Sequence, residues 1–165
     1  MSAAALSWRS GRSLAGLALF LALSLLVSGL GGLITSTTVD GWYQTLAKPP
    51  FNPPDWLFAP VWTTLFVLMA VAAWRVWLQP PSPDRQWGLR LYGLQLAFNL
   101  GWSFLFFGLM APPAALVEIV WLLALIAATG WLFARADRVA GLLFVPYLAW
   151  VAFAALLNGW IVWLN

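Results

Sequence analysis

The chain has 165 residues, of which 63% are hydrophobic and only 8% are charged, and its net charge is +3. Soluble domains carry about 25% charged residues, so this composition indicates a protein whose natural solvent is a lipid bilayer. The chain has no cysteine and no histidine. Disulfides, thiolate nucleophiles, zinc sites and histidine-dependent catalysis are therefore excluded. The basic residues form no stripe and accompany no nucleic-acid motif, so a nucleic-acid partner is not expected.

In chain order, five apolar segments have close to the length that a bilayer requires, which is about 20 residues. The segments cover residues 14–34, 57–78, 87–108, 113–134 and 139–163. The first segment follows Arg9 and Arg12, as a signal peptide would, but it is long and no clear cleavage site follows it. We therefore predict an all-α integral membrane protein with a single domain over residues 1–165, built as a bundle of five transmembrane helices.

A long loop, residues 35–56, separates the first two predicted spans. Its second part, GWYQTLAKPPFNPPDW (residues 41–56), contains four prolines within six residues. Proline lacks a backbone donor and fixes φ, so no regular helix or strand is expected to run through this stretch. Its aromatic residues have surface to bury, which argues against disorder. We predict an ordered lid.

The basic residues predict an orientation. With five spans, the N-terminus and the second and fourth connectors lie on one side of the membrane. The arginines assigned to that side are Arg9, Arg12, Arg75, Arg85, Arg90, Arg135 and Arg138. The other side, with residues 35–56 and the C-terminus, has only Lys48. By the positive-inside rule, the N-terminus faces the cytoplasm and the loop faces the opposite side.

Polar and small residues occupy two different faces of the third predicted span. Tyr92, Gln95 and Asn99 share one face, which is expected to look into the bundle. The small residues on the other face are Gly93, Ala97 and Gly101. A ridge of this kind permits close helix approach, either to a second subunit or to a neighbouring helix of the same chain.

The other spans add further candidates for a site inside the bundle. One face of the fifth span carries Tyr147, Trp150, Ala154 and Asn158, and the second span contributes Trp62. Glu118 is the only acidic residue within a span. Because charge at membrane depth is costly, it either contacts a ligand or proton, or it pairs with an interior amide or reaches water near a helix end.

Four stretches of the chain resemble the TspO/MBR family, the tryptophan-rich sensory proteins that include the mitochondrial translocator protein. They are WYQTLAKPPFNPPDW (42–56), PVWTTLF (60–66), YGLQLAFNLGWSFLFFG (92–108) and VPYLAWVAFAALLN (145–158). The resemblance implies a five-helix bundle, often a homodimer, that binds porphyrins and related tetrapyrroles in a pocket beneath the first loop. In several members it also implies binding of cholesterol and of synthetic aromatic ligands.

The resemblance also implies site residues. Trp62 and Trp150 correspond to the tryptophans that are implicated, in some bacterial members, in light-dependent porphyrin breakdown. The further positions near the family pocket are Asn99, Trp102, Tyr147, Ala154 and Asn158. Glu118 stands where many members have an acidic residue and is a further candidate for ligand binding, and the loop candidates are Trp42, Tyr43, Lys48 and Phe51. Lys48, the only cation on its side, either binds a propionate or is a solvated loop lysine.

Several positions depart from the family pattern. Phe51 stands where tryptophan is usual, Pro50 where serine or tryptophan is usual, and Leu100 where animal members carry tryptophan. Gly159 and Trp163 replace the tyrosine and the basic residue of the animal cholesterol-recognition pattern. Sterol binding through that motif is not expected, and the remaining signals fit a protein of a bacterial membrane.

These observations predict a membrane tetrapyrrole-binding protein that acts as a sensor, carrier or translocator. The alternative is an enzyme-like, light-dependent degradation of protoporphyrin that uses Trp62 and Trp150. A third possibility is a membrane scaffold whose pocket is filled by lipid. No cofactor is obligatory and no metal site is expected; porphyrin or haem is the ligand. Without histidine or cysteine, haem iron would need tyrosine, methionine or water, which favours metal-free protoporphyrin or a haem held at its periphery.

Overall fold

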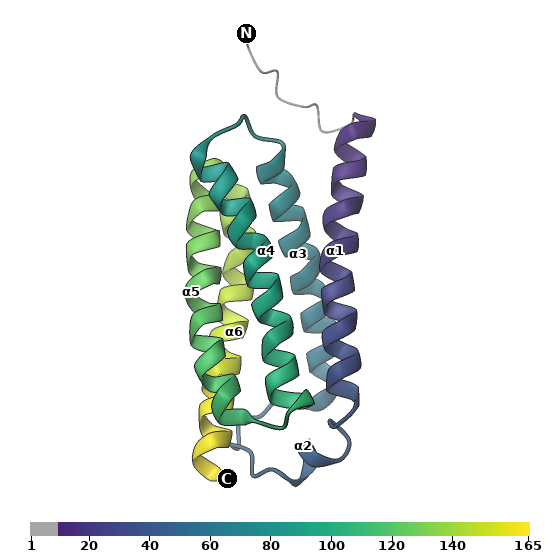
Figure 1. Cartoon of the computed structure of the whole chain (residues 1–165), viewed down its shortest axis with the longest axis vertical. Helices are drawn as coiled ribbons and strands as arrows, with labels where there is room; N and C mark the ends of the chain where they lie inside the picture. The colour runs from purple at the N-terminus through teal and green to yellow at the C-terminus, as the bar shows by residue number, and fades with distance from the viewer. Residues whose placement is uncertain (1–9) are drawn as a thin grey trace.

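The computed structural model describes residues 10–165, and the regular structure in this part of the chain is entirely helical (Figure 1). Five long helices run alternately up and down, and a four-residue helix lies in the first loop. The helices are α1 (Gly11–Ser36), α2 (Trp42–Thr45), α3 (Phe58–Trp77), α4 (Pro83–Ser103), α5 (Pro112–Ala136) and α6 (Arg138–Leu164). Each predicted span coincides with a long helix to within a few residues, except at the end of α4.

Four of the long helices in residues 10–165 are long and apolar enough to cross a membrane: α1, α3 with the turn before it, α5 and α6. This finding makes the chain a multi-pass membrane protein. Helix α4 does not meet the same standard, because its first two turns carry Asp84, Arg85 and Arg90 and its middle carries Gln95 and Asn99. By length and composition, four of the five predicted spans are therefore confirmed as candidates, and the span predicted at α4 is not.

Helix ends follow capping chemistry. The Ser10 hydroxyl accepts from the backbone N–H of Ser13 at 3.2 Å, and Ser82 caps α4 in the same way before a proline at its first position. The predicted spans 113–134 and 139–163 leave a connector of four residues between them, which is too long. Helix α5 continues to Ala136 and α6 begins at Arg138, since Asp137 ends one helix and caps the next.

The predicted absence of regular structure in residues 41–56 is wrong at both ends of that stretch. Helix α2 forms before the first proline, where every residue still has a backbone donor, and a single 3₁₀ turn, Asp55–Leu57, follows the last one. Residues 46–54 between them have no regular structure. The C-terminal residue holds this segment: the Asn165 side chain accepts from the Ala47 N–H and donates to the Ala47 carbonyl, both at 3.0 Å.

The end of α4 widens. The α-helix stops at Ser103, and Phe104–Gly108 form one π-helical turn in which the Leu109 N–H donates to the Phe104 carbonyl at 2.8 Å. Met110 then adopts a left-handed conformation, with φ of 51°, and turns the chain into α5. π-Bulges of this kind are frequent at functional sites.

The bundle has a packed side and a loose side. Helix α5 packs most extensively against α6 and α4, whereas α1 contacts chiefly α3 and stands at the edge of the bundle in Figure 1. Only Ser13, Gly16 and Ser24 of α1 are buried. The α2 loop and the C-terminus lie at one end of the bundle, and the α3–α4 and α5–α6 connections lie at the other (Figure 1). We call the first of these the loop end and the second the arginine end.

Candidate functional site: a cavity beneath the first loop

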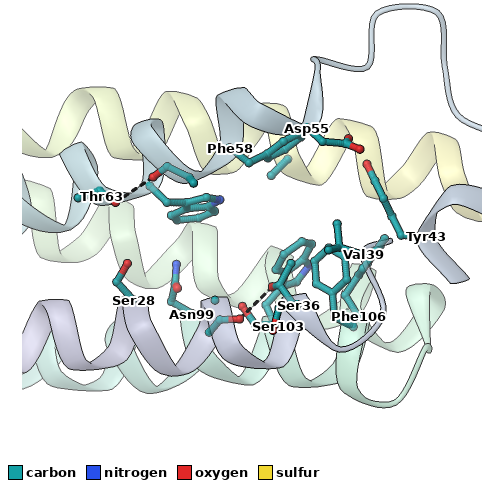
Figure 2. A pocket seen from close by; sticks show the side chains of 18 of the residues that line it. Ser28, Ser36, Val39, Tyr43, Asp55, Phe58, Thr63, Asn99, Ser103 and Phe106 are labelled. Atoms are coloured by element: carbon teal, nitrogen blue, oxygen red, sulfur yellow. Dashed lines mark hydrogen bonds between the residues drawn. The ribbon is translucent and has the colours of Figure 1, made fainter. Parts of the chain in front are cut away.

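A cavity of about 630 Å³ occupies the loop end of the bundle, between α1, α3, α4 and α6. Its volume lies within the range of small-molecule sites, about 300–1,000 Å³. In Figure 2, Phe58 and Asp55 lie on one side of the cavity, Ser28 and Asn99 lie on the other, and Tyr43 stands at the end that the loop covers. The lining residues from the helices of the bundle include Ser28, Gly31, Thr35, Phe58, Trp62, Phe66, Asn99, Trp102, Ser103, Trp150, Ala154 and Asn158.

Two tryptophans from different helices give the cavity aromatic walls. Trp62 of α3 meets Tyr147 edge to face with ring centroids 6.4 Å apart, and Trp150 of α6 meets Phe58 at 5.8 Å. The indole N–H of Trp150 is buried and has no acceptor among residues 10–165. An unpaired buried donor is costly, at about 1–3 kcal/mol, so this group is available to a polar atom of a ligand.

Amide side chains fix the wall that α4 contributes. The Trp102 indole N–H donates to the Asn158 side-chain oxygen at 3.2 Å, and the Asn158 amide donates to the Pro112 carbonyl at 2.9 Å. Asn158 is 1% exposed. These bonds tie α4, α5 and α6 together beside the cavity, and they orient the Trp102 ring, which stacks on Phe106 at 5.1 Å.

A second network lies below the cavity. The Asn99 amide donates to the Tyr147 hydroxyl at 3.1 Å, and that hydroxyl donates to the Gln95 side-chain oxygen at 2.7 Å. Asn99 lines the cavity, but Tyr147 and Gln95 do not. The predicted site residue Tyr147 is fully buried and positions Asn99 and Trp62 from behind.

Only one of the four predicted loop residues, Tyr43, lines the cavity. Its hydroxyl donates to the Asn52 side chain at 3.2 Å. Burial raises the pKa of Tyr43, and the negative charge of Asp55 acts in the same direction, so the phenol is neutral near pH 7. The structure does not bring the other three into the lining. Trp42 packs on Phe106.

Phe51 and Lys48 are the remaining two loop residues. Phe51 packs on Phe153 and Trp160 on the outer side of α6. The Lys48 ammonium lies 4.5 Å from the centre of the Tyr43 ring, outside the lining.

Glu118 also lies outside the cavity. One carboxylate oxygen faces Gly101 of α4, at 3.6 Å from the position of an added Cβ. Neither oxygen has a hydrogen-bond partner in the described part of the chain. Among residues 10–165, Glu118 therefore does not pair with an interior amide, which was one of the roles that the sequence left open for it. Residues 10–165 also hold no group of three or more carboxylate, histidine or cysteine side chains that could bind a metal ion.

Sequence reasoning missed the contribution of α1. One wall of the cavity consists of small and polar residues of α1, among them Ser28, Gly31, Gly32 and Thr35. The signal that could have found them is the run SGLGG at positions 28–32, where small residues leave space beside the bundle. The two carboxylates at the loop side of the cavity, Asp40 and Asp55, were also missed.

The fold and this site define a class: a multi-pass helical membrane protein with an aromatic ligand cavity inside its bundle. The TspO/MBR family model matches residues 3–164, and the chain belongs to that family. It is 46% identical over 153 residues to the tryptophan-rich protein TspO of Chlorobaculum tepidum, covering 90% of this chain and 95% of that protein.

Two further relatives come from different kinds of organism. The tryptophan-rich sensory protein of Cereibacter sphaeroides is 46% identical over 121 residues, covering 72% of this chain and 73% of the relative. The translocator protein of Sus scrofa is 41% identical over 144 residues, covering 84% and 85%. Since the family includes both bacterial and animal proteins, a bacterial membrane stays a prediction.

Proposed function

We propose that the cavity binds a tetrapyrrole of the porphyrin type and that the protein acts as a sensor or carrier of this ligand. The observation that carries the proposal is the pair Trp62 and Trp150 on facing helices, with a buried indole donor that lacks an acceptor. Flat aromatic ligands gain about 0.5–1.5 kcal/mol from each ring contact beyond simple burial. The names of the relatives, sensory protein and translocator protein, support the same class of role.

The charges around the cavity bear on the form of the ligand. Asp40 and Asp55 line it, whereas Lys48 does not. Propionate groups placed at the loop side would therefore meet like charge, which weakens binding. We infer that ring stacking and burial, not a lysine–propionate pair, supply the affinity. Protoporphyrin dimethyl ester is then expected to bind at least as tightly as the free acid.

A titration of the purified protein tests both statements. Quenching of tryptophan fluorescence would be followed with protoporphyrin, its dimethyl ester, haem and a linear tetrapyrrole. Saturable quenching by protoporphyrin, reduced in Ala154→Phe because the larger ring fills the cavity, supports the proposal. If no tetrapyrrole quenches, the scaffold with a lipid-filled cavity is favoured. If the ester binds much more weakly than the acid, the propionates contribute to the affinity and Asp40 and Asp55 do not repel them.

A second candidate function is light-dependent degradation of protoporphyrin. It is favoured by the presence of Trp62 and Trp150 in one cavity, where both rings would contact the same ligand. The bound protein would be illuminated in the presence of dioxygen and its absorbance followed. Loss of the porphyrin bands that is abolished in Trp62→Phe or Trp150→Phe, but retained in the exposed control Trp121→Phe, indicates degradation. If the porphyrin bands stay unchanged while the protein still binds protoporphyrin, the role of sensor or carrier is favoured.

We also propose that α4 crosses the membrane, so that the bundle spans five times with its arginine end in the cytoplasm. Arg12, Arg75, Arg85, Arg90, Arg135 and Arg138 belong to that end, and Arg9 lies outside the described residues. Because the chain has no cysteine, single cysteines can report the topology. An impermeant maleimide added to intact cells should label Thr37→Cys at the loop end and spare Gln86→Cys at the arginine end; the reverse pattern would overturn the orientation.

A homodimer through α4 is a further proposal. Gly93 and Ala97 are exposed, and an added Cβ at Gly93 would meet nothing within 4 Å, so this ridge is not used within one chain. Gly101, by contrast, faces Glu118. If two copies meet at the ridge, Gly93→Leu should shift the protein from dimer to monomer in light scattering of the detergent-solubilised protein. An unchanged molar mass would exclude this interface.

A further inference from the structure

A second hollow lies on the outer surface of the bundle, between α5 and α6 at the arginine end. Its volume is about 430 Å³, and it shares no residue with the cavity beneath the loop. Trp131 on one side and Leu142 and Val145 on the other form its raised edges, with exposed fractions of 61%, 67% and 57%. The hollow is therefore an apolar groove that faces the surroundings of the bundle rather than its interior.

Small residues make the floor of this groove. Gly130, Ala134 and Gly141 line it, and the two helices approach so closely that a Cβ added at Gly141 would lie 2.4 Å from the Ala134 Cβ. Along α6 the groove extends from Arg138 to Leu148. Ten residues of helix correspond to about 15 Å, which is half of the about 30 Å hydrocarbon core of a bilayer. The groove thus has the depth of one leaflet.

A positively charged side chain, Arg138, lies at one end of this groove. Arg138 lines the groove and is exposed, and it is the first residue of α6, where the helix dipole disfavours positive charge. Within residues 10–165, the carboxylates at this end are Asp84 and Asp137. Both are engaged, Asp84 by Arg135 at 2.9 Å and Asp137 by Arg75 at 2.8 Å. Neither carboxylate forms an ion pair with Arg138, so its guanidinium is open to an anion from outside the described chain.

We propose that this groove binds an anionic phospholipid, with an acyl chain along the small-residue floor and the headgroup phosphate on the Arg138 guanidinium. Length, apolar lining and terminal charge each match one part of such a lipid. The position also fits the orientation proposed above, because an arginine end in the cytoplasm would meet the leaflet in which anionic lipids attract basic residues. Trp131 contributes an aromatic edge near the headgroup level, where tryptophan is favoured, with the Arg135 guanidinium 5.0 Å from its ring centre.

Competition between two lipids tests the proposal. The full-length protein in detergent would be given equal amounts of phosphatidylglycerol and phosphatidylcholine with identical acyl chains, and bound lipid would be counted by native mass spectrometry. The parent protein should prefer phosphatidylglycerol. Arg138→Gln should lose about fivefold of this preference, which corresponds to the about 1 kcal/mol of one basic residue at an anionic surface.

Matched variants separate the two halves of the site. Ala127→Leu, which adds bulk at an exposed floor position, should lower the occupancy of both lipids, whereas Ala22→Leu on the exposed face of α1 should not. Arg90→Gln removes an arginine of the same end outside the groove and should leave the preference intact. The proposal is overturned if Arg138→Gln keeps the full preference, if Arg90→Gln loses as much, or if inorganic phosphate alone displaces the lipid.

Discussion

The two ends of the bundle are built on different principles. At the arginine end, charges pair and helices touch: Asp137 accepts from Arg75 and from two backbone N–H groups, and α5 and α6 approach at Gly141. At the loop end, a cavity with aromatic walls separates α1 from α6, and only a small cluster of buried residues, among them Tyr43, Phe106 and Phe107, packs beside it. The comparison indicates that stability is concentrated at the arginine end, which leaves the loop end free to remain hollow for a ligand.

The largest effect on this comparison is expected from Asp137→Ala. Asp137 is a buried ion-pair partner, since its side chain is 7% exposed, and it also caps α6. Its loss would leave Arg75 without this carboxylate and remove the cap, at a cost of about 3–4 kcal/mol. Denaturant unfolding in detergent would measure this loss in the free energy of unfolding. Asp137→Asn, which can keep the cap, should lose less; a loss below 1 kcal/mol in the alanine variant would refute the assignment.

A smaller effect is expected from Gly141→Ala. The new methyl group would lie 2.4 Å from the Ala134 Cβ, so α5 and α6 would have to separate, at a cost of about 1–3 kcal/mol. Gly159→Ala in the same helix is the matched control, because its methyl group would meet only Leu116 at 3.9 Å. Thermal unfolding should separate the two variants. Equal stabilities would mean that the close approach at the arginine end is not what supports the fold.

The smallest effect is expected from Asn165→Ala at the loop end. The variant removes the pair of hydrogen bonds that hold Ala47, both of them exposed, each worth about 0.5–1.5 kcal/mol. Hydrogen exchange of residues 46–54 should accelerate while global unfolding changes little. Gln86→Ala, an exposed amide at the arginine end, should leave this exchange unchanged. Unaltered exchange in Asn165→Ala would show that the C-terminus does not hold the loop.

The positions of the helices could be predicted from the sequence because hydrophobic length is a local property. The cavity residues of α3, α4 and α6 could also be predicted from the sequence, since Trp62, Asn99 and Asn158 are polar or aromatic residues within apolar spans. The wall from α1 was not accessible, because Gly31 and Ser28 line the cavity through the space they leave, which depends on where α1 packs. The positions of Lys48 and Phe51 outside the cavity could not be predicted either, because the path of an irregular loop decides where its side chains lie.

We propose that the tetrapyrrole occupies the hollow loop end and not the groove at the arginine end. The absence of native cysteine permits a direct measurement: the rate of maleimide labelling of Ala154→Cys in the cavity and of Ala127→Cys in the groove, each with and without protoporphyrin. We expect protoporphyrin to slow labelling at Ala154→Cys and to leave labelling at Ala127→Cys unchanged. Unchanged labelling at Ala154→Cys under saturating protoporphyrin, or protection only at Ala127→Cys, would contradict it.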